Sequence, residues 1–162
     1  LQSKKSDVGK VLCYGIAAQY LVVPVVTYPF IWIFDIDANR ISEPARELSD
    51  KATSPIGVIA IILTVGLLAP FAEELFFRGL LYGSIRKRGD SARNQKLIVW
   101  TSVVISSAIF SAIHFQLLLF PALFVVGMIF ALIYERSGRL APAIWAHVGF
   151  NATTLFSLLV LD

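Results

Sequence analysis

Three ionisable side chains stand at the end of an apolar stretch of the sequence. Glu73, Glu74 and Arg78 follow residues 56–72, which include no charged residue. A charge deep in a bilayer costs roughly a few to more than ten kcal/mol, so these residues need chemistry or pairing to offset that cost. On a helix Glu74 and Arg78 lie one turn apart and can pair, whereas Glu73 is rotated by about 100° toward another neighbour.

Both histidines of the chain also lie in apolar stretches. His114 is the fifth residue of the string FSAIHF, and His147 precedes Asn151 by four residues, so that His147 and Asn151 share one face of a helix. Carboxylates, imidazoles and an amide together form a chemically sufficient set: a general base, an imidazole that orients it and donors for an oxyanion. The chemistry that these residue types predict is general-base catalysis with stabilisation of an oxyanion.

Each feature also has a structural interpretation. Glu74 and Arg78 could be a purely structural ion pair, with Glu73 held uncharged by burial, although one arginine does not require two glutamates. A single histidine within a membrane often serves only as a hydrogen-bonding group between helices. The functional interpretation is favoured because all these polar residues occur in the membrane segments of one small chain.

The elements that must position these residues are membrane helices. Of the 162 residues, 57% are hydrophobic and 15% charged, and the mean hydropathy is +0.74; soluble domains carry about 25% charged residues. The predicted fold is all-α, a polytopic transmembrane helical bundle with about five membrane segments and a buried polar site. The segments are 11–34, which Pro24 and Pro29 are expected to kink, 56–72 with a helical pattern continuing to about Arg86, 97–115, 116–134 and 140–161.

The polar segment 35–55 reads as an exposed loop that has room for a short surface helix. We therefore divide the chain into residues 1–55, the first membrane segment with its polar loop, and residues 56–162, the catalytic core. If each segment crosses once, ten Lys and Arg residues fall on one side and three on the other. The side with ten, which holds the loop between Arg86 and Lys96, is expected to be cytoplasmic or its organellar equivalent.

Composition limits the partners and the compartment. The net charge of +3 and the pI near 9.2 follow from this charge asymmetry, so they predict contact with a lipid bilayer and require no nucleic acid. The protein is expected to be an integral, multi-pass protein of a plasma or organelle membrane. The single Cys13 allows no internal disulfide, and a start at Leu1 suggests a piece of a longer protein.

Three short motifs resemble those of a known family. Glu73-Glu74-x-x-x-Arg78, Phe110-x-x-x-His114 and His147-x-x-x-Asn151 occur in the order and spacing of the CAAX prenyl protease and bacteriocin-processing family. This family consists of intramembrane endopeptidases and includes the Ras-converting prenyl endopeptidases. The resemblance covers roughly residues 56–154, and no motif position departs from the family pattern.

The resemblance implies a role for each residue. Glu73 would activate the attacking water with help from His114, and His147 and Asn151 would stabilise the oxyanion. Glu74 and Arg78 would support the site by pairing with each other or with His147. No cofactor is favoured. Zinc or another divalent metal would be held by Glu73, His114 and His147, but the H-E-x-x-H spacing of common zinc peptidases is absent.

The function implied is intramembrane peptide hydrolysis, of the CAAX type or the bacteriocin-processing type. The substrate would be a membrane-associated peptide or protein, with its prenylation left open. A non-proteolytic relative acting as a membrane scaffold, binding or immunity subunit is the alternative. A transporter or proton-relay subunit is a third possibility, but it would predict inverted repeats, which the sequence does not display.

One feature conflicts with a simple bundle of straight helices. Counted from the flanking basic residues at about 1.5 Å per residue, Glu73 would lie about 20 Å deep, His147 about 12 Å and His114 about 27 Å. These depths do not coincide. Convergence of the three side chains therefore requires kinks at Pro70, Pro121 or Pro142, a strong tilt, or a helix that begins outside the hydrocarbon.

Overall fold

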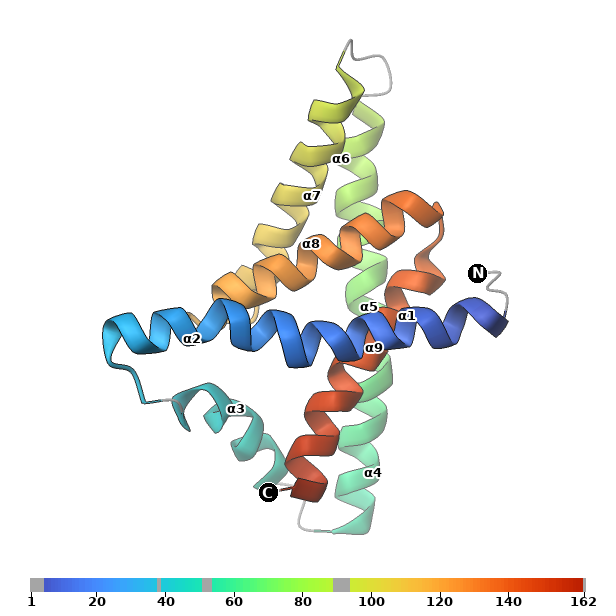
Figure 1. The fold of residues 1–162 in the computed structure, drawn as a ribbon. Helices are drawn as coiled ribbons and strands as arrows, with labels where there is room; N and C mark the ends of the chain where they lie inside the picture. Colours follow the sequence, from blue (N-terminus) through green and yellow to red (C-terminus); the bar gives the residue numbers. More distant parts are fainter. Residues whose placement is uncertain (1–4, 38, 51–53, 89–93, 162) are drawn as a thin grey trace.

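The computed structural model of the chain consists of helices joined by short turns (Figure 1). It describes residues 5–37, 39–50, 54–88 and 94–161, and no strand occurs within those ranges. Five helical runs are long and apolar enough to cross a membrane: Val8–Phe34, Pro55–Arg88, Gln95–Ala112, Phe120–Ser137 and Leu140–Val160. The chain is a multi-pass membrane protein, and the all-helical fold predicted from the sequence is confirmed.

The third and fourth membrane helices leave a longer connection than predicted. Helix α7 (Gln95–Ala112) ends before residue 115, and α8 (Phe120–Ser137) begins after residue 116. Phe115 has a φ of 53°, which lies outside the right-handed helical region. Pro121 occupies the first turn of α8, where a missing N–H leaves no helical hydrogen bond unmade. The resulting turn, residues 113–119, carries His114.

The polar segment after the first membrane helix contains a helix of its own, α3 (Asn39–Asp50). Asp37 begins it, because its Oδ1 accepts a hydrogen bond from the backbone N–H of Asn39 at 2.9 Å. Three basic residues counted in the orientation argument, Lys4, Lys51 and Arg93, lie outside the described residues. The side of the membrane on which the basic residues lie stays a prediction.

The second membrane run is one long succession of helical segments that carries the acidic pair at its middle. It comprises α4 (Pro55–Leu63), the π-helical η2 (Thr64–Leu68), α5 (Ala69–Glu74), the π-helical η3 (Leu75–Tyr82) and α6 (Gly83–Arg88). Ser54 caps its start by accepting a hydrogen bond from Gly57 N at 3.1 Å. The predicted continuation of the helix through the glutamates is therefore confirmed.

Two of the π-helical segments lie just ahead of a proline. In the first membrane run, η1 (Ala18–Val22) joins α1 (Lys5–Ala17) to α2 (Val23–Phe34) and precedes Pro24. In the second run, η2 precedes Pro70 in the same way. Proline has no N–H to donate and crowds the preceding turn, so the helix widens locally where it approaches one.

The length of the second run accounts for the unequal depths estimated from the sequence. Its 34 residues span about 50 Å, against roughly 30 Å of hydrocarbon. Figure 1 shows α6 and α7 extending together past the turn between α8 and α9 (Leu140–Phe156). The basic residues near position 86 therefore lie farther out than Arg139. Depths counted from these two reference points cannot be compared directly.

The core that surrounds the site is formed where α8 and α9 meet the first membrane run. Val126 and Phe130 of α8 pack with Ala146 and Phe150 of α9, and Ala18 of η1 closes the cluster. A second cluster of Tyr82, Val103 and Ala131 joins η3, α7 and α8. The site residues thus lie between two packed cores.

The first membrane run crosses α9 so closely that the backbones of the two helices are in contact (Figure 1). A Cβ atom added at Gly15 would lie 1.8 Å from the carbonyl oxygen of Ala146, and one added at Gly149 would lie 2.5 Å from the carbonyl oxygen of Leu12. Any side chain at either position would therefore have to displace backbone. Small residues permit such close helix packing within membranes, where dispersion contacts rather than water drive association.

We predict that Gly15→Ala destabilises the protein by at least about 1–3 kcal/mol, because α1 must move away from α9. Thermal unfolding in detergent micelles measures the effect. Gly9→Ala is the matched control, since nothing lies within 4 Å of its added Cβ and a helical Gly→Ala change is otherwise favourable by about 1 kcal/mol. Equal unfolding temperatures for the two variants would contradict the close crossing.

Candidate active site

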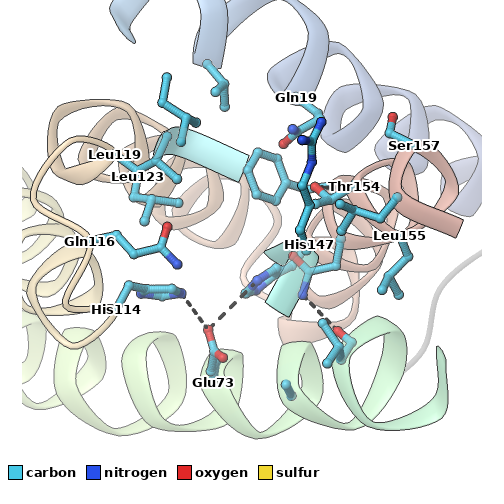
Figure 2. Close-up of a pocket in the computed structure, with 18 of the residues that line it drawn as sticks. Gln19, Glu73, His114, Gln116, Leu119, Leu123, His147, Thr154, Leu155 and Ser157 are labelled. Carbon is cyan, nitrogen blue, oxygen red and sulfur yellow. Dashed lines mark hydrogen bonds and ion pairs between the residues drawn. The ribbon is translucent and has the colours of Figure 1, made fainter. Parts of the chain in front are cut away.

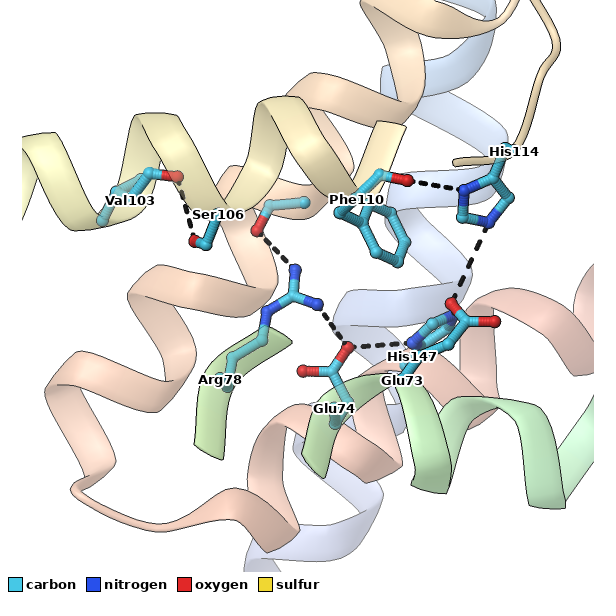
Figure 3. A network of polar contacts seen from close by, with 9 residues as sticks. Glu73, Glu74, Arg78, Val103, Ser106, Phe110, His114 and His147 are labelled. Carbon is cyan, nitrogen blue, oxygen red and sulfur yellow. Dashed lines mark hydrogen bonds and ion pairs between the residues drawn. The ribbon is translucent and has the colours of Figure 1, made fainter. Parts of the chain in front are cut away.

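The second glutamate of the pair is completely buried and holds two partners at once. Glu74 Oε1 accepts a hydrogen bond from Arg78 Nη1 at 2.8 Å and lies 2.9 Å from His147 Nδ1 (Figure 3). The side chains of Glu74 and Arg78 have no exposed surface. The structure therefore contains both of the pairings that the sequence analysis offered as alternatives for these residues.

Arg78 is also held by groups outside its own motif Glu73-Glu74-x-x-x-Arg78. Its Nη2 donates to the backbone carbonyl of Gly127 at 2.9 Å, and its guanidinium lies 4.9 Å from the ring centre of Phe110 and 5.6 Å from that of Phe130. A guanidinium that is taken out of water keeps favourable interactions with ring faces and with carbonyl oxygens. Arg78 is thereby fixed between η3, α7 and α8.

The two histidines are oriented through the same ring nitrogen. His147 stacks on Phe130, with ring centres 4.8 Å apart, and its Nδ1 faces Glu74. His114 lies 2.7 Å from the carbonyl oxygen of Phe110 through its own Nδ1. Carbonyl and carboxylate oxygens only accept hydrogen bonds, so each Nδ1 carries a proton and each Nε2 is left to face the site.

The Phe110-x-x-x-His114 motif has a local explanation in the end of α7. Phe110 is buried, and its ring lies 4.8 Å from the His114 ring and 5.3 Å from the Phe77 ring. The carbonyl of Phe110 is in the last turn of the helix, where backbone acceptors are free for side-chain donors. One residue thus supports the imidazole with its ring and fixes it with its backbone.

Glu73 lies between the two imidazoles. Its Oε2 is 3.9 Å from Nε2 of His114 and 3.9 Å from Nε2 of His147 (Figure 2). Within the part of the chain that the structure describes, this buried oxygen has no hydrogen-bond partner. Separations of 3.9 Å are too long for direct hydrogen bonds. Two polar atoms at such a separation can be bridged by a water molecule.

Asn151 is bound to the backbone of the acidic helix. Its Nδ2 donates to the carbonyl of Val65 at 2.8 Å. In η2 the N–H of Ala69 bonds to Thr64, so the next donor in that register would be residue 70. Pro70 has no N–H, which leaves the Val65 carbonyl without a helical partner. Asn151 therefore compensates for the proline three residues before Glu73 and joins α9 to this helix.

A cavity of about 560 Å³ opens from these residues toward the first membrane run and α3. Glu73, His114, His147 and Asn151 all line it, whereas Glu74 and Arg78 lie behind them. Most of the remaining wall is apolar and includes Leu119, Leu123, Phe150, Leu155, Leu158 and Leu159. The structure thus brings all six predicted site residues together, with four at the cavity and two beneath it. Their chemical roles stay predictions.

The donor atoms around Glu73 are of the kinds that bind zinc, but their spacing is too wide. Two imidazole nitrogens and one carboxylate oxygen form a common catalytic zinc set. Ligand atoms of a tetrahedral zinc ion lie about 3.4 Å apart, whereas both nitrogen–oxygen separations here are 3.9 Å. Across residues 5–37, 39–50, 54–88 and 94–161, no group of three or more His, Cys, Asp or Glu side chains is arranged to hold a metal ion. This arrangement does not fit zinc.

Several residues of the site were missed in the sequence analysis. The carbonyls of Val65 and Gly127 hold Asn151 and Arg78, but backbone groups are the same at every position and carry no sequence signal of their own. Pro70 was the available clue to a free carbonyl. Gln19 and Gln116, which also line the cavity, lack the charge that drew attention to the other residues.

Comparison with known proteins gives a family match and three relatives. Residues 55–153 match the family described as type II CAAX prenyl endopeptidase Rce1-like. An uncharacterized 24.3 kDa protein of Escherichia coli is 37% identical over 101 residues, which is 60% of this chain and 43% of that protein. The membrane-embedded CAAX protease MroQ of Staphylococcus aureus (strain USA300) is 33% identical over 99 residues, or 60% of this chain and 39% of MroQ.

A third relative is the putative membrane peptidase YdiL of Bacillus subtilis (strain 168), which is 28% identical over 123 residues, or 74% of this chain and 44% of YdiL. The chain thus spans less than half the length of each of these relatives. No solved structure gives a significant match.

We predict that Pro70→Ala reduces the cost of removing the Asn151 amide. Asn151→Ala alone leaves the Val65 carbonyl unpaired and should lower the free energy of unfolding by about 1–3 kcal/mol. With alanine at position 70 the helix regains an N–H, so the same change should cost less. A double-mutant cycle by thermal unfolding measures this coupling. Thr154→Ala, one turn along α9, is the control and should be additive with Pro70→Ala; additivity for Asn151→Ala as well would contradict the interpretation.

Proposed function

Because the chain belongs to the family of type II CAAX prenyl endopeptidases of the Rce1-like type, we propose that it is an intramembrane endopeptidase that hydrolyses a peptide bond with a water molecule activated by Glu73. The observation that carries the proposal is the buried Oε2 of Glu73, which has no hydrogen-bond partner in the described part of the chain and lies at equal distances from two imidazole nitrogens. The substrate is a membrane-associated peptide or protein, prenylated or not.

In the first step, Glu73 Oε2 takes a proton from a water held between the carboxylate and His114 Nε2. As the O–H bond breaks, the water oxygen attacks the carbonyl carbon of the substrate and the carbonyl oxygen becomes an oxyanion. His114 orients the water by accepting a hydrogen bond, because its Nδ1 proton is already committed to Phe110. A water fixed in this way requires little reorganisation before it reacts.

In the second step, the tetrahedral intermediate collapses. The proton held by Glu73 passes to the substrate nitrogen, the C–N bond breaks, and a carboxylic acid and an amine are released. Each proton that Glu73 receives is thus returned, so the enzyme ends the cycle unchanged. Glu73 acts first as a general base and then as a general acid.

Two donors are proposed to stabilise the oxyanion. Asn151 uses one amide N–H on Val65 and has a second for the cavity. His147 can donate through Nε2 when it carries both ring protons. The carboxylates of Glu73 and Glu74 with Arg78 sum to one net negative charge, which a doubly protonated His147 would neutralise. Donors that are fixed before the reaction stabilise a developing charge most effectively in a site of low dielectric constant.

Glu73→Gln should lower turnover by at least about 10²–10⁴-fold, the usual contribution of a general base, while the fold persists. The substitution preserves size and some hydrogen bonding, but an amide cannot take the proton from water. Cleavage is measured by proteomics of membrane peptides, with wild type compared against the variant, and by assay of the purified protein. An unchanged cleavage profile would refute the mechanism and favour a non-proteolytic scaffold, binding or immunity subunit.

Metal removal should leave activity largely unchanged, because the donor spacing around Glu73 does not fit zinc. The purified protein is dialysed against EDTA or 1,10-phenanthroline, and its cleavage rate is compared with that of a sample dialysed against buffer alone. Loss of activity that stoichiometric zinc restores would overturn this expectation and make Glu73, His114 and His147 metal ligands.

A further inference from the structure

We propose that Gln19 and Gln116 form a subsite for the main chain of an extended, apolar peptide segment, with Gln19 accepting a backbone N–H of the substrate. This inference deepens the proposed function, on which it rests, by naming what recognises the peptide. Both glutamines line the cavity that contains Glu73 (Figure 2). Neither takes part in the pairing network beneath that cavity.

Gln19 has an unmet requirement for a hydrogen-bond donor. Its Oε1 is buried, and no group in the described part of the chain donates to it. An unsatisfied buried carbonyl costs about 1–3 kcal/mol, and such groups in folded proteins call for a specific explanation. A donor supplied by a bound molecule provides that explanation, because Gln19 is one of the residues that line the cavity.

The position of Gln19 is fixed by its neighbours. It lies in η1, directly after Ala18, which is 2% exposed and packs in the core with Val126 and Phe130. Gly15, one turn earlier, is in backbone contact with α9. The glutamine is therefore presented from a rigid part of the first membrane run, which favours a binding role.

Gln116 belongs to a different wall of the same cavity. It follows His114 in the turn between α7 and α8, and Figure 2 shows it beside that histidine, whereas Gln19 projects from the wall that faces Glu73. A side-chain amide carries a donor and an acceptor and no charge. Two such groups on separate walls can pair with the N–H and C=O groups of a peptide backbone.

The remaining lining indicates the character of the peptide. Leu119, Leu123 and Phe150 line the same cavity as the two glutamines, so side chains of the bound segment would contact apolar surface. The volume of about 560 Å³ falls in the range of specific ligand sites, roughly 300–1,000 Å³. A lipid acyl chain would fill the apolar part, but it has no N–H to offer Gln19.

The experiment uses a library of internally quenched octapeptides on the full chain in nanodiscs of phosphatidylcholine and phosphatidylglycerol. The octapeptide that binds tightest to the Glu73→Gln protein is selected, so that selection does not depend on cleavage. A series of this peptide with one backbone amide N-methylated at a time is then tested against wild type and Gln19→Met. Gln95→Met, in the first turn of α7 and away from the cavity, is the matched control.

We expect Gln19→Met to weaken binding of the parent octapeptide and to raise its KM by about 10-fold, with kcat little changed. N-methylation at one position should weaken binding to wild type by a similar factor and should cost nothing more in Gln19→Met. The unfolding temperature of Gln19→Met should equal or exceed that of wild type, because the change removes a buried amide oxygen that has no donor in the described part of the chain. Gln95→Met should bind as wild type does.

Three results would overturn the inference: no octapeptide binds saturably, every N-methylated peptide responds equally in both proteins, or Gln19→Met loses stability and binding together. If Gln19→Met changed the binding of lipid in the cavity but left the binding of peptide unchanged, that result would also overturn the inference and would assign the cavity to lipid. Peptide binding that depends on Gln19 but is never followed by cleavage would refute the proposed function and leave the subsite standing.

Discussion

The whole arrangement depends on one buried carboxyl group and the two side chains that pair with it. Glu74 has no exposed surface, and it is compensated by Arg78 on its own helical run and by His147 on α9. Removing one partner of such a buried pair typically costs about 3–5 kcal/mol, because the other charge is left uncompensated. Arg78 in turn needs the Gly127 carbonyl and the aromatic faces of Phe110 and Phe130. Helices α7, α8 and α9 are thus all connected to Glu74, either directly or through Arg78. Glu73 is held in place by the same contacts because it is the preceding residue on the same helix.

The two adjacent glutamates divide their tasks because neighbouring residues on a helix face different directions. Glu74 points into the packed interior, where its Oε1 has both Arg78 and His147 as partners, whereas Glu73 reaches the cavity wall and has no such pair among the described groups. Glu74 also lies behind the cavity residues, whereas Glu73 lines the cavity and can meet a bound molecule. The pair thus separates the stability of the site from its reactivity.

The sequence was most informative where charge or periodicity marks a position. Glu73, Glu74 and Arg78 stood out because an apolar helix does not otherwise tolerate them, and the apolar stretches predicted the membrane helices to within a few residues. The turn that holds His114 was misplaced inside a helix, because Phe115 and Leu117 look like continuing membrane sequence. The bond from Asn151 to Val65 could not be read from a pattern, since its acceptor is backbone. Gln19 was overlooked because an uncharged amide costs little in an apolar segment, and only its buried position reveals its lack of a partner.

The turn at residues 113–119 couples access to the site with its competence. His114 is not within a helix and is fixed by the Phe110 carbonyl and ring, and Gln116 follows it on the same short connection. One short segment thus supplies both a wall of the cavity and the imidazole that faces Glu73. Under the proposed mechanism, a shift of this turn would alter the shape of the cavity and the position of the imidazole together.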